Sequence, residues 1–244
     1  MPSIYRKHGF AIVPKAFAQR GRRTSVSRPV NLSLFVGEPE FVADQWGLWQ
    51  TARFSARTCA RLLYTAAIAP CLAMELFDRQ NKKGPATYFE CLIGHLFASS
   101  IGVNPVKRAT VPVGRKSVRL TMDFLFDLPN GPSLHLPVKM STRERVVQAW
   151  AHQRILDAAY GESAYRGIMV LFAEMKLDSR SHEVVEICVP DQWLAYQARL
   201  ARMERIYYFD VPRRYAALAQ QHKGVIAVKP FTDFFTEKAS LLRS

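Results

Sequence analysis

Three charged side chains in largely apolar stretches are the first candidates for chemistry in this sequence. Asp123 and Glu90 each interrupt an apolar run, and Lys139 ends one. Burying a lone charge costs free energy unless a partner compensates for it, so each of these side chains requires a partner. Two interpretations follow: an ion pair that only stabilises a strand end, or a charged site that acts on a ligand.

A predicted β-hairpin brings Asp123 and Lys139 together. The hairpin consists of a strand, a turn and a returning strand, predicted over residues 116–128, 129–132 and 133–140. With this turn, Asp123 lies opposite Val138 and beside Lys139. Spacing alone leaves the structural ion pair and the functional site both open.

A helix is predicted to begin directly after Lys139. Ser141 stands three positions before Glu144, which is the capping-box pattern, and Gly161 ends the helix. The free amide groups at a helix N-terminus attract phosphate. The helix therefore places a phosphate-binding end next to the charged pair, and it also carries His152.

The order of these residues resembles the core of the PD-(D/E)XK nucleases. In that family an acid on a helix and an acid on a following strand help to hold Mg²⁺, and a lysine on the next strand positions or helps to activate the attacking water. The resemblance implies these roles for Glu90, Asp123 and Lys139. It also implies that the carbonyl oxygen of Val138 is a metal ligand, and that the cofactor is Mg²⁺.

Two positions depart from the family pattern. Met122 stands where a proline is frequent, and Pro137 stands where the second acid of the (D/E)-x-K triplet is expected. Restriction endonucleases that cut CCGG- or CCWGG-type sites often lack this acid, and residues 136–148 resemble the corresponding block of those enzymes. The resemblance spans residues 84–160, and Glu144 is a possible replacement for the missing acid.

In those restriction enzymes a basic–acidic–arginine triplet after the lysine reads C·G base pairs. The resemblance implies that Arg143 and Arg145 face guanine and that Glu144 accepts a hydrogen bond from cytosine, which agrees with the hydrogen-bonding edges of these bases. The other side chains expected to contact DNA are those of Ser141, Thr142 and Gln148. A helix start with paired charges is the structural interpretation of the same triplet.

Three further residues compete for the catalytic roles. Glu174 and Lys176 form a literal E-x-K pattern at the end of a predicted strand. A whole helix separates them from Asp123, so they do not lie on the neighbouring strand of the hairpin. Asp127 lies four residues beyond Asp123 along one strand and shares its face, so it is either a supporting ligand or the start of the turn.

The remaining pattern predicts an α/β fold. Helices are predicted over residues 41–58, 60–78, 85–100 and 191–205, and strands over residues 167–178, 183–189, 206–210 and 225–229. This order predicts a mixed central β-sheet flanked by helices, and the resemblance implies a restriction-endonuclease-like core with an N-terminal helical and basic extension. Residues 1–80 are expected to pack on a nuclease core of residues 81–244, together forming one continuous domain.

Charge and composition favour a nucleic-acid partner. The 244 residues carry a net charge of +14, which attracts polyanions, with an anionic membrane as the main rival to nucleic acid. Residues 1–37 hold seven Lys or Arg and no acid, which fits a DNA-contacting arm or an organellar transit peptide. No apolar run is long enough to span a bilayer, and the four cysteines lack zinc-site spacing.

These features together predict a Mg²⁺-dependent, sequence-specific endonuclease of double-stranded DNA, a type II restriction enzyme whose target contains C·G pairs. Its expected partners are duplex DNA, a second copy of the chain in a homodimer, and a cognate DNA methyltransferase, in the cytoplasm of a prokaryote. The alternatives are a repair or resolving nuclease of the same fold that recognises DNA structure, a non-catalytic basic DNA-binding protein, and an organellar protein with a cleaved leader.

Overall fold

The computed structural model describes residues 10–12, 29–31, 33–35, 56–77, 80, 83–129, 131–142, 146–174, 176–177, 184–185 and 190–242. The chain forms two compact units, residues 1–89 with 174–185 and residues 90–173 with 186–244. No helix within the described ranges is long and apolar enough to cross a bilayer. The predicted helix over residues 41–58 falls almost entirely outside these ranges, as does most of the basic segment 1–37.

The first unit contains one long buried helix, α3 (Ala56–Phe77). Four consecutive residues from Leu62 onward are buried, which covers a whole helical turn, and the helix confirms the one predicted over residues 60–78. The hydroxyl of Tyr64 accepts a hydrogen bond from the backbone amide of Asn31 at 2.9 Å. The short strands of this unit pair antiparallel, β1 (Phe10–Ile12) with β2 (Pro29–Asn31) and β8 (Lys176–Leu177) with β9 (Val184–Val185).

The second unit is built on a mixed β-sheet, which confirms the predicted fold class. The strands follow the order β11-β10-β7-β5-β4-β3, and β6 pairs with β7 beyond the end of β5. Pairing is parallel from β11 to β5 and antiparallel from β5 to β3. The strands are β3 (Val106–Val113), β4 (Lys116–Phe126), β5 (Ser133–Leu136), β6 (Val138–Lys139), β7 (Tyr165–Leu171), β10 (Met203–Tyr208) and β11 (Val228–Pro230).

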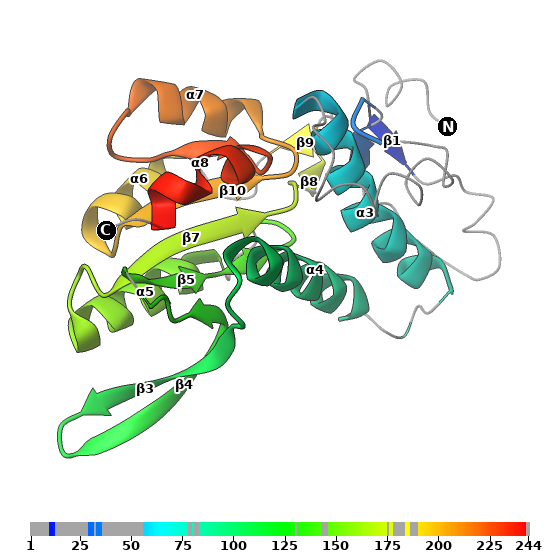
Figure 1. Ribbon diagram of the computed structural model, residues 1–244. Coiled ribbons are helices and arrows are strands. Elements are labelled where there is room, and N and C mark those ends of the chain that lie inside the picture. The colour runs from blue at the N-terminus through cyan, green and yellow to red at the C-terminus, as the bar shows by residue number, and fades with distance from the viewer. Residues whose placement is uncertain are drawn as a thin grey trace. The chain divides into compact units, whose positions relative to one another are not determined.

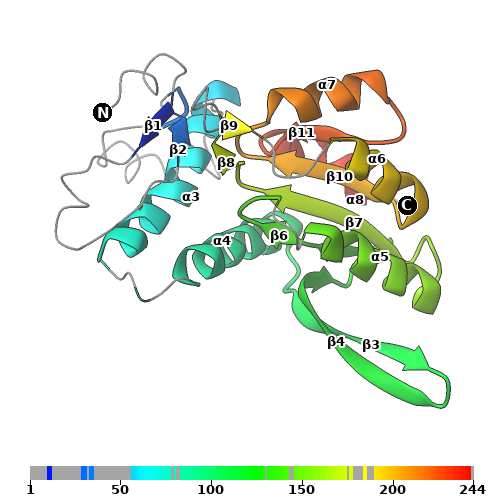
Figure 2. The ribbon, with the colours of Figure 1, turned by 180° about the vertical axis from the view of Figure 1, so that it is seen from behind.

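Helices cover both faces of this sheet, as the two opposite views show (Figures 1 and 2). One face carries α5 (Val147–Tyr160), α6 (Pro190–Arg199) and α7 (Arg213–Gln221), and the other carries α4 (Gly84–Ile101) and α8 (Asp233–Leu242). Successive residues of β10 alternate between the two cores. Ile206 and Tyr208 pack in the cluster beneath α5, α6 and α7, whereas the ring of Tyr207 lies 6.0 Å from that of Phe234 in α8.

The hairpin of β4 and β5 forms as predicted, but its register differs by one residue. Phe124 pairs with Leu136 and Phe126 with Leu134, so the continuation of this register puts Asp123 opposite Pro137, one residue earlier than Val138. The difference arises because the connecting loop is longer than a four-residue turn. β4 already ends at Phe126, and Leu128 does not pair.

Several elements differ from the sequence-based prediction. β3, α7 and α8 were not predicted, because β3 mixes basic residues and Pro112 with few apolar ones, and the two helices are short. The predicted capping box is wrong: α5 begins at Val147, after Val146, which makes no side-chain cap hydrogen bond. The chain instead stays buried after β6, since Met140 accepts a hydrogen bond from the amide of Ala173 at 3.3 Å.

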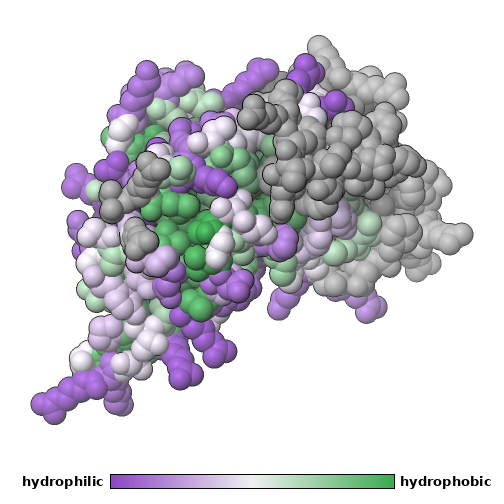
Figure 3. Space-filling model, viewed as in Figure 1, coloured by the Kyte–Doolittle hydropathy of each residue, from purple (hydrophilic) through white to green (hydrophobic). Residues whose placement is uncertain are grey.

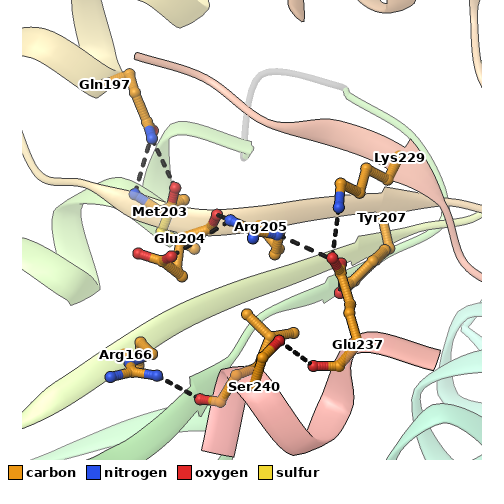
Figure 4. A network of polar contacts seen from close by, with 10 residues as sticks. Arg166, Gln197, Met203, Glu204, Arg205, Tyr207, Lys229, Glu237 and Ser240 are labelled. Carbon is orange, nitrogen blue, oxygen red and sulfur yellow. Dashed lines mark hydrogen bonds and ion pairs between the residues drawn. The ribbon is translucent and has the colours of Figure 1, made fainter. Parts of the chain in front are cut away.

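A polar network fixes α8 to the sheet (Figure 4). Glu237 accepts hydrogen bonds from the hydroxyl of Tyr207, from the ammonium of Lys229 and, at 3.3 Å, from Nε of Arg205. Burial alone would raise the pKa of Glu237, but the bonds from Lys229 and Tyr207 outweigh it and the pKa is lowered. Glu237 is therefore a charged acceptor that ties two strands to the last helix.

Gly94 marks a close approach of α4 to β4. Gly94 lies in the middle of α4, and a β-carbon at this position would lie only 2.4 Å from Cζ of Phe124 on β4. Helix α4 ends at Gly102, whose φ of 77° suits glycine. Because Phe124 adjoins Asp123, the missing side chain at Gly94 sets how closely α4 approaches the strand that carries the acid.

The variant Gly94→Ala tests this packing. Helix propensity alone predicts a gain of roughly 1 kcal/mol in the free energy of unfolding, whereas overpacking against a ring predicts a loss of about 1–3 kcal/mol. We expect the loss, measured by urea denaturation. The double variant Gly94→Ala/Phe124→Leu should recover most of it in a double-mutant cycle. A single variant at least as stable as the wild type would contradict the close contact.

Candidate active site

A carboxylate and an ammonium meet at the end of the β4–β5 hairpin. Oδ2 of Asp123 accepts a hydrogen bond from Nζ of Lys139 at 2.6 Å and a second from the backbone amide of Val138 at 2.8 Å. The side chains are 23% and 26% exposed, respectively, so the pair is open to solvent on one side. The predicted proximity of Asp123 and Lys139 is confirmed.

The ladder between β4 and β5 ends just before the charged pair. Its last partners are Phe124 and Leu136, and Pro137 follows between β5 and β6. The chain remains bound to β7 instead, where the carbonyl of Pro137 accepts from Val170 N at 2.9 Å and that of Lys139 accepts from Phe172 N at 3.1 Å. This switch leaves the amide of Val138 unpaired in the ladder, and the Asp123 side chain accepts its hydrogen bond.

The carbonyl of Val138 faces the same edge as the Asp123 carboxylate. The carbonyls of successive strand residues point to opposite edges, and those of Pro137 and Lys139 both point to β7. The N–H and carbonyl of Val138 must therefore point away from β7, and the N–H reaches Asp123. Two oxygen-bearing groups thus lie on the side of β6 that faces away from β7.

Glu90 is held by a lysine that the sequence analysis did not single out. Its Oε1 accepts a hydrogen bond from Nζ of Lys107 at 2.6 Å, and the same ammonium lies 4.7 Å from the ring centroid of Phe124. The hydrogen bond to Glu90 raises the pKa of Lys107, and the negative charge of Asp123 adds to that effect. Lys107 therefore lies within electrostatic reach of both acids. It was missed because β3, which carries it, was not predicted.

The donor set suits a small, hard cation that keeps part of its water shell. Mg²⁺ prefers oxygen ligands and is commonly held by one or two protein groups together with water and substrate phosphate. Asp123 and the carbonyl of Val138 meet that requirement at one edge. Within the described ranges no three His, Cys, Asp or Glu side chains cluster closely enough to hold a metal ion, so a metal here would need backbone, water or phosphate oxygens besides side chains.

Two histidines lie beside the charged pair. His152 on α5 is half-buried, and burial lowers its pKa, while the charge of Asp123 raises it and that of Lys139 lowers it. His135 on β5 is fully buried, with its ring centroid 6.3 Å from that of His152. In the sequence, His152 stands four residues after Gln148 in a predicted helix. This spacing puts the two side chains on one face of the helix.

The hydroxyl residues expected to contact DNA are not accessible. Ser141 is 8% exposed and Thr142 is fully buried, because the chain leaving β6 stays against the interior. This corrects the assignment of their side chains to the DNA surface. Arg143, Glu144 and Arg145 lie outside the described residues. Gln148 is exposed in the first turn of α5.

The competing residues occupy other places. Asp127 is exposed just after β4 and accepts a hydrogen bond from the hydroxyl of Ser133 at 3.2 Å, which makes it part of the loop. Glu174 is buried and belongs to the first unit. Lys176 lies in β8, where its backbone pairs with Val185, and its side chain is outside the described set.

Two solved structures are similar to this chain. The crystal structure of the type IIP restriction endonuclease Kpn2I matches with a TM-score of 0.72, over 89% of this chain and 78% of that chain, at 23% sequence identity. The chain has a restriction-endonuclease fold. The restriction endonuclease PspGI, in a complex with substrate DNA, matches with a TM-score of 0.47 over 82% and 77% of the chains at 14% identity. No protein-family model and no curated protein sequence matches the chain.

The fold explains where the charged pair lies and confirms the expected architecture. The residues that carried the resemblance to nucleases come from α4, β4 and β6, which all belong wholly or largely to the sheet-containing unit. Two of the three, Asp123 and Lys139, contact each other directly, and Glu90 contacts Lys107. The arrangement can present a carboxylate, a carbonyl and an ammonium to one phosphate.

The buried ring of His135 predicts a pH-dependent stability. Its Nδ1 donates to Oε1 of Gln153 at 2.9 Å, since the amide nitrogen of Gln153 donates to Asp157 and to the carbonyl of Tyr165. Burial lowers the pKa of His135 from 6.5 to about 4, although the bond to Gln153 offsets part of this shift. Over a range of pH, His135 therefore stays unprotonated in the folded chain but takes up a proton in the unfolded chain.

We expect the free energy of unfolding to fall as the pH drops from 6.5 to about 5, with a contribution from His135 approaching roughly 1.4 kcal/mol per pH unit. Urea denaturation at several pH values measures this slope. The variant His135→Gln, which cannot titrate, should show a shallower slope. Equal slopes in the two proteins would mean that His135 is not buried as a neutral ring.

Proposed function

We propose that this protein is an endonuclease that hydrolyses phosphodiester bonds of duplex DNA at a specific sequence, with Mg²⁺ as its cofactor. The observation that carries the proposal is the contact of Asp123 and Lys139 beside the backbone of Val138, on a sheet with a restriction-endonuclease fold. The net charge of +14 supports it, since a basic surface attracts the DNA backbone.

Asp123 and the carbonyl of Val138 would hold the metal ion. Bound there, Mg²⁺ would lower the pKa of a coordinated water and stabilise negative charge on the phosphate. Glu90 accepts a hydrogen bond from Lys107 at 2.6 Å, and exchange of this partner would free its carboxylate for the ligand set. Substrate phosphate offers Lys107 an alternative partner, so binding of DNA would release Glu90 toward the metal.

Lys139 acts on the substrate in this proposal. Its ammonium is about a quarter exposed, so it can keep its bond to Asp123 and still donate to a phosphate oxygen or to the attacking water. The water oxygen forms a bond to phosphorus, and the bond from phosphorus to the leaving sugar oxygen breaks. The proton lost by the water passes to solvent, and the leaving oxygen takes up a proton from another water. Held by Asp123, Lys139 stays in place while the phosphate changes geometry.

Sequence recognition is assigned to the beginning of α5 and the segment before it. In the proposal Arg143 and Arg145 contact guanine, Glu144 contacts cytosine, and Gln148 adds a further base contact, with about 1–3 kcal/mol of discrimination for each good bidentate pair. This predicts a target that contains C·G pairs. A palindromic target would require a two-fold homodimer, and a cognate methyltransferase would protect the same site in the host.

Cleavage assays with matched variants test the proposal. Unmethylated phage DNA is incubated with Mg²⁺ and either the wild type, Asp123→Asn or Lys139→Met. We expect discrete fragments from the wild type and a loss of at least about 100-fold in each variant. Asn keeps an acceptor for the Val138 amide, so thermal melting should show that Asp123→Asn remains folded. Lys176→Met is the matched control and should cut like the wild type.

The outcomes separate the alternatives. A smear without discrete fragments would favour a nuclease that recognises DNA structure. Salt-sensitive binding without cleavage in any metal would favour a non-catalytic DNA-binding protein. Loss of cleavage in Lys176→Met but not in Lys139→Met would move the catalytic lysine to the E-x-K sequence and contradict the role of the hairpin.

A further inference from the structure

The segment between α4 and the charged pair is basic throughout. Residues 103–122 contain five Lys or Arg and no Asp or Glu. One of the five, Lys107, is paired with Glu90. The other four are exposed and make no ion pair within the part of the chain that the structure describes: Arg108, Arg115, Lys116 and Arg119.

These four cations lie on a projecting two-stranded arm, residues 108–121, termed here the β3–β4 arm. Seven partner pairs join the two strands, from Val113 with Lys116 at the tip down to Val106 with Leu125 beyond the arm. β5 pairs only with the last three residues of β4, so the arm extends past the rest of the sheet (Figures 1 and 2). Hydrophilic side chains project from it at the lower left of Figure 3.

One face of the arm is fixed to the protein and the other is free for a partner. Ala109 and Val111 are buried in a cluster with Leu156 of α5, and the hydroxyl of Tyr160 donates to the carbonyl of Thr110. Because side chains alternate along a strand, Arg108 and Thr110 face the opposite way, and so do their cross-strand partners Thr121 and Arg119. The outer face is therefore a rigid patch of two guanidinium and two hydroxyl groups.

We propose that the β3–β4 arm binds the DNA backbone beside the cleavage site, with Arg108 and Arg119 each contacting a phosphate. The proposal rests on the proposed nuclease function and extends it to a second surface. Arg119 precedes Asp123 by four residues, a distance of about 13 Å along an extended strand, or roughly four base pairs of duplex. Guanidinium and hydroxyl groups are common phosphate donors, and they carry no base specificity in this role.

A different explanation for the same charges is protection of an edge strand. β3 is the outermost strand of the sheet, and charged residues with a proline such as Pro112 prevent edge-to-edge association. That explanation accounts for charge at the edge of β3, and it extends to Arg119, since the pairing of β4 with β5 covers only residues 124–126. It also predicts self-association, rather than weaker DNA binding, when the charges are removed.

Salt-dependent DNA binding tests the proposal. The double variant Arg108→Gln/Arg119→Gln is compared with a control that loses the same charge at the opposite edge of the sheet, Arg213→Gln/Lys223→Gln on and just after α7, which packs on β11. Both control side chains are exposed. Anisotropy of labelled duplex DNA of arbitrary sequence is measured in EDTA from about 50 to about 200 mM salt, and size-exclusion chromatography reports the oligomeric state.

We expect the plot of log affinity against log salt to become shallower by about 1.8 in the arm variant, since each lost phosphate contact accounts for about 0.9. The affinity advantage of the wild type should therefore grow about tenfold as salt is lowered fourfold. The control should keep the wild-type slope, because charge at the other edge does not contact the duplex, and neither variant should change oligomeric state.

Equal slopes in the arm variant and the control would overturn the proposal, as would an arm variant that aggregates and keeps the wild-type slope. Cleavage by the wild type separates this failure from failure of the proposed function. If the wild type cuts DNA and the arm variant keeps the wild-type salt slope, only the proposed role of the arm is refuted. If the wild type neither binds nor cuts DNA, both the proposed nuclease function and the proposed role of the arm are refuted.

Discussion

The site depends on where the ladder between β4 and β5 ends. The antiparallel pairing stops at Phe124 with Leu136, just before Pro137, while the parallel pairing with β7 continues in β6. The amide of Val138 then turns to the Asp123 side chain, and Lys139 follows on the same short strand. If the antiparallel ladder continued, the amide of Val138 would donate to a backbone carbonyl of β4 in place of the carboxylate.

The same proline stands where the family pattern expects an acid, and this has an energetic consequence. The charges near β4 form two acid–lysine pairs, Asp123 with Lys139 and Glu90 with Lys107. A second carboxylate beside Asp123 would disfavour both charges unless a cation lay between them. With a backbone carbonyl there instead, the charged groups stay balanced without a metal. In the proposed mechanism a metal ion would join Asp123 and this carbonyl while Lys139 keeps its bond to Asp123.

Much of this arrangement was predictable because it is local. The hairpin, helix α4 and its end at Gly102, and the contact of Asp123 with Lys139 follow from turn residues and short spacings. The register shift, the buried course of Thr142 and the arm of β3 were not predictable. They depend on which distant strands supply hydrogen bonds, above all β7, and in β3 the short apolar alternation of Ala109, Val111 and Val113 is masked by basic residues and Pro112. Lys107 was overlooked for that reason.

Affinity cleavage with iron would test most directly whether Asp123 and Val138 hold the metal. Fe²⁺ binds carboxylate and carbonyl sites of this kind, and with ascorbate and peroxide it generates radicals that cut the protein backbone beside its ligands. The account predicts cuts next to Asp123 and between Pro137 and Lys139, suppressed by excess Mg²⁺ and absent in Asp123→Asn. Cuts that cluster instead around Glu174 and Lys176, or that ignore Mg²⁺, would contradict the assignment of the site to the hairpin.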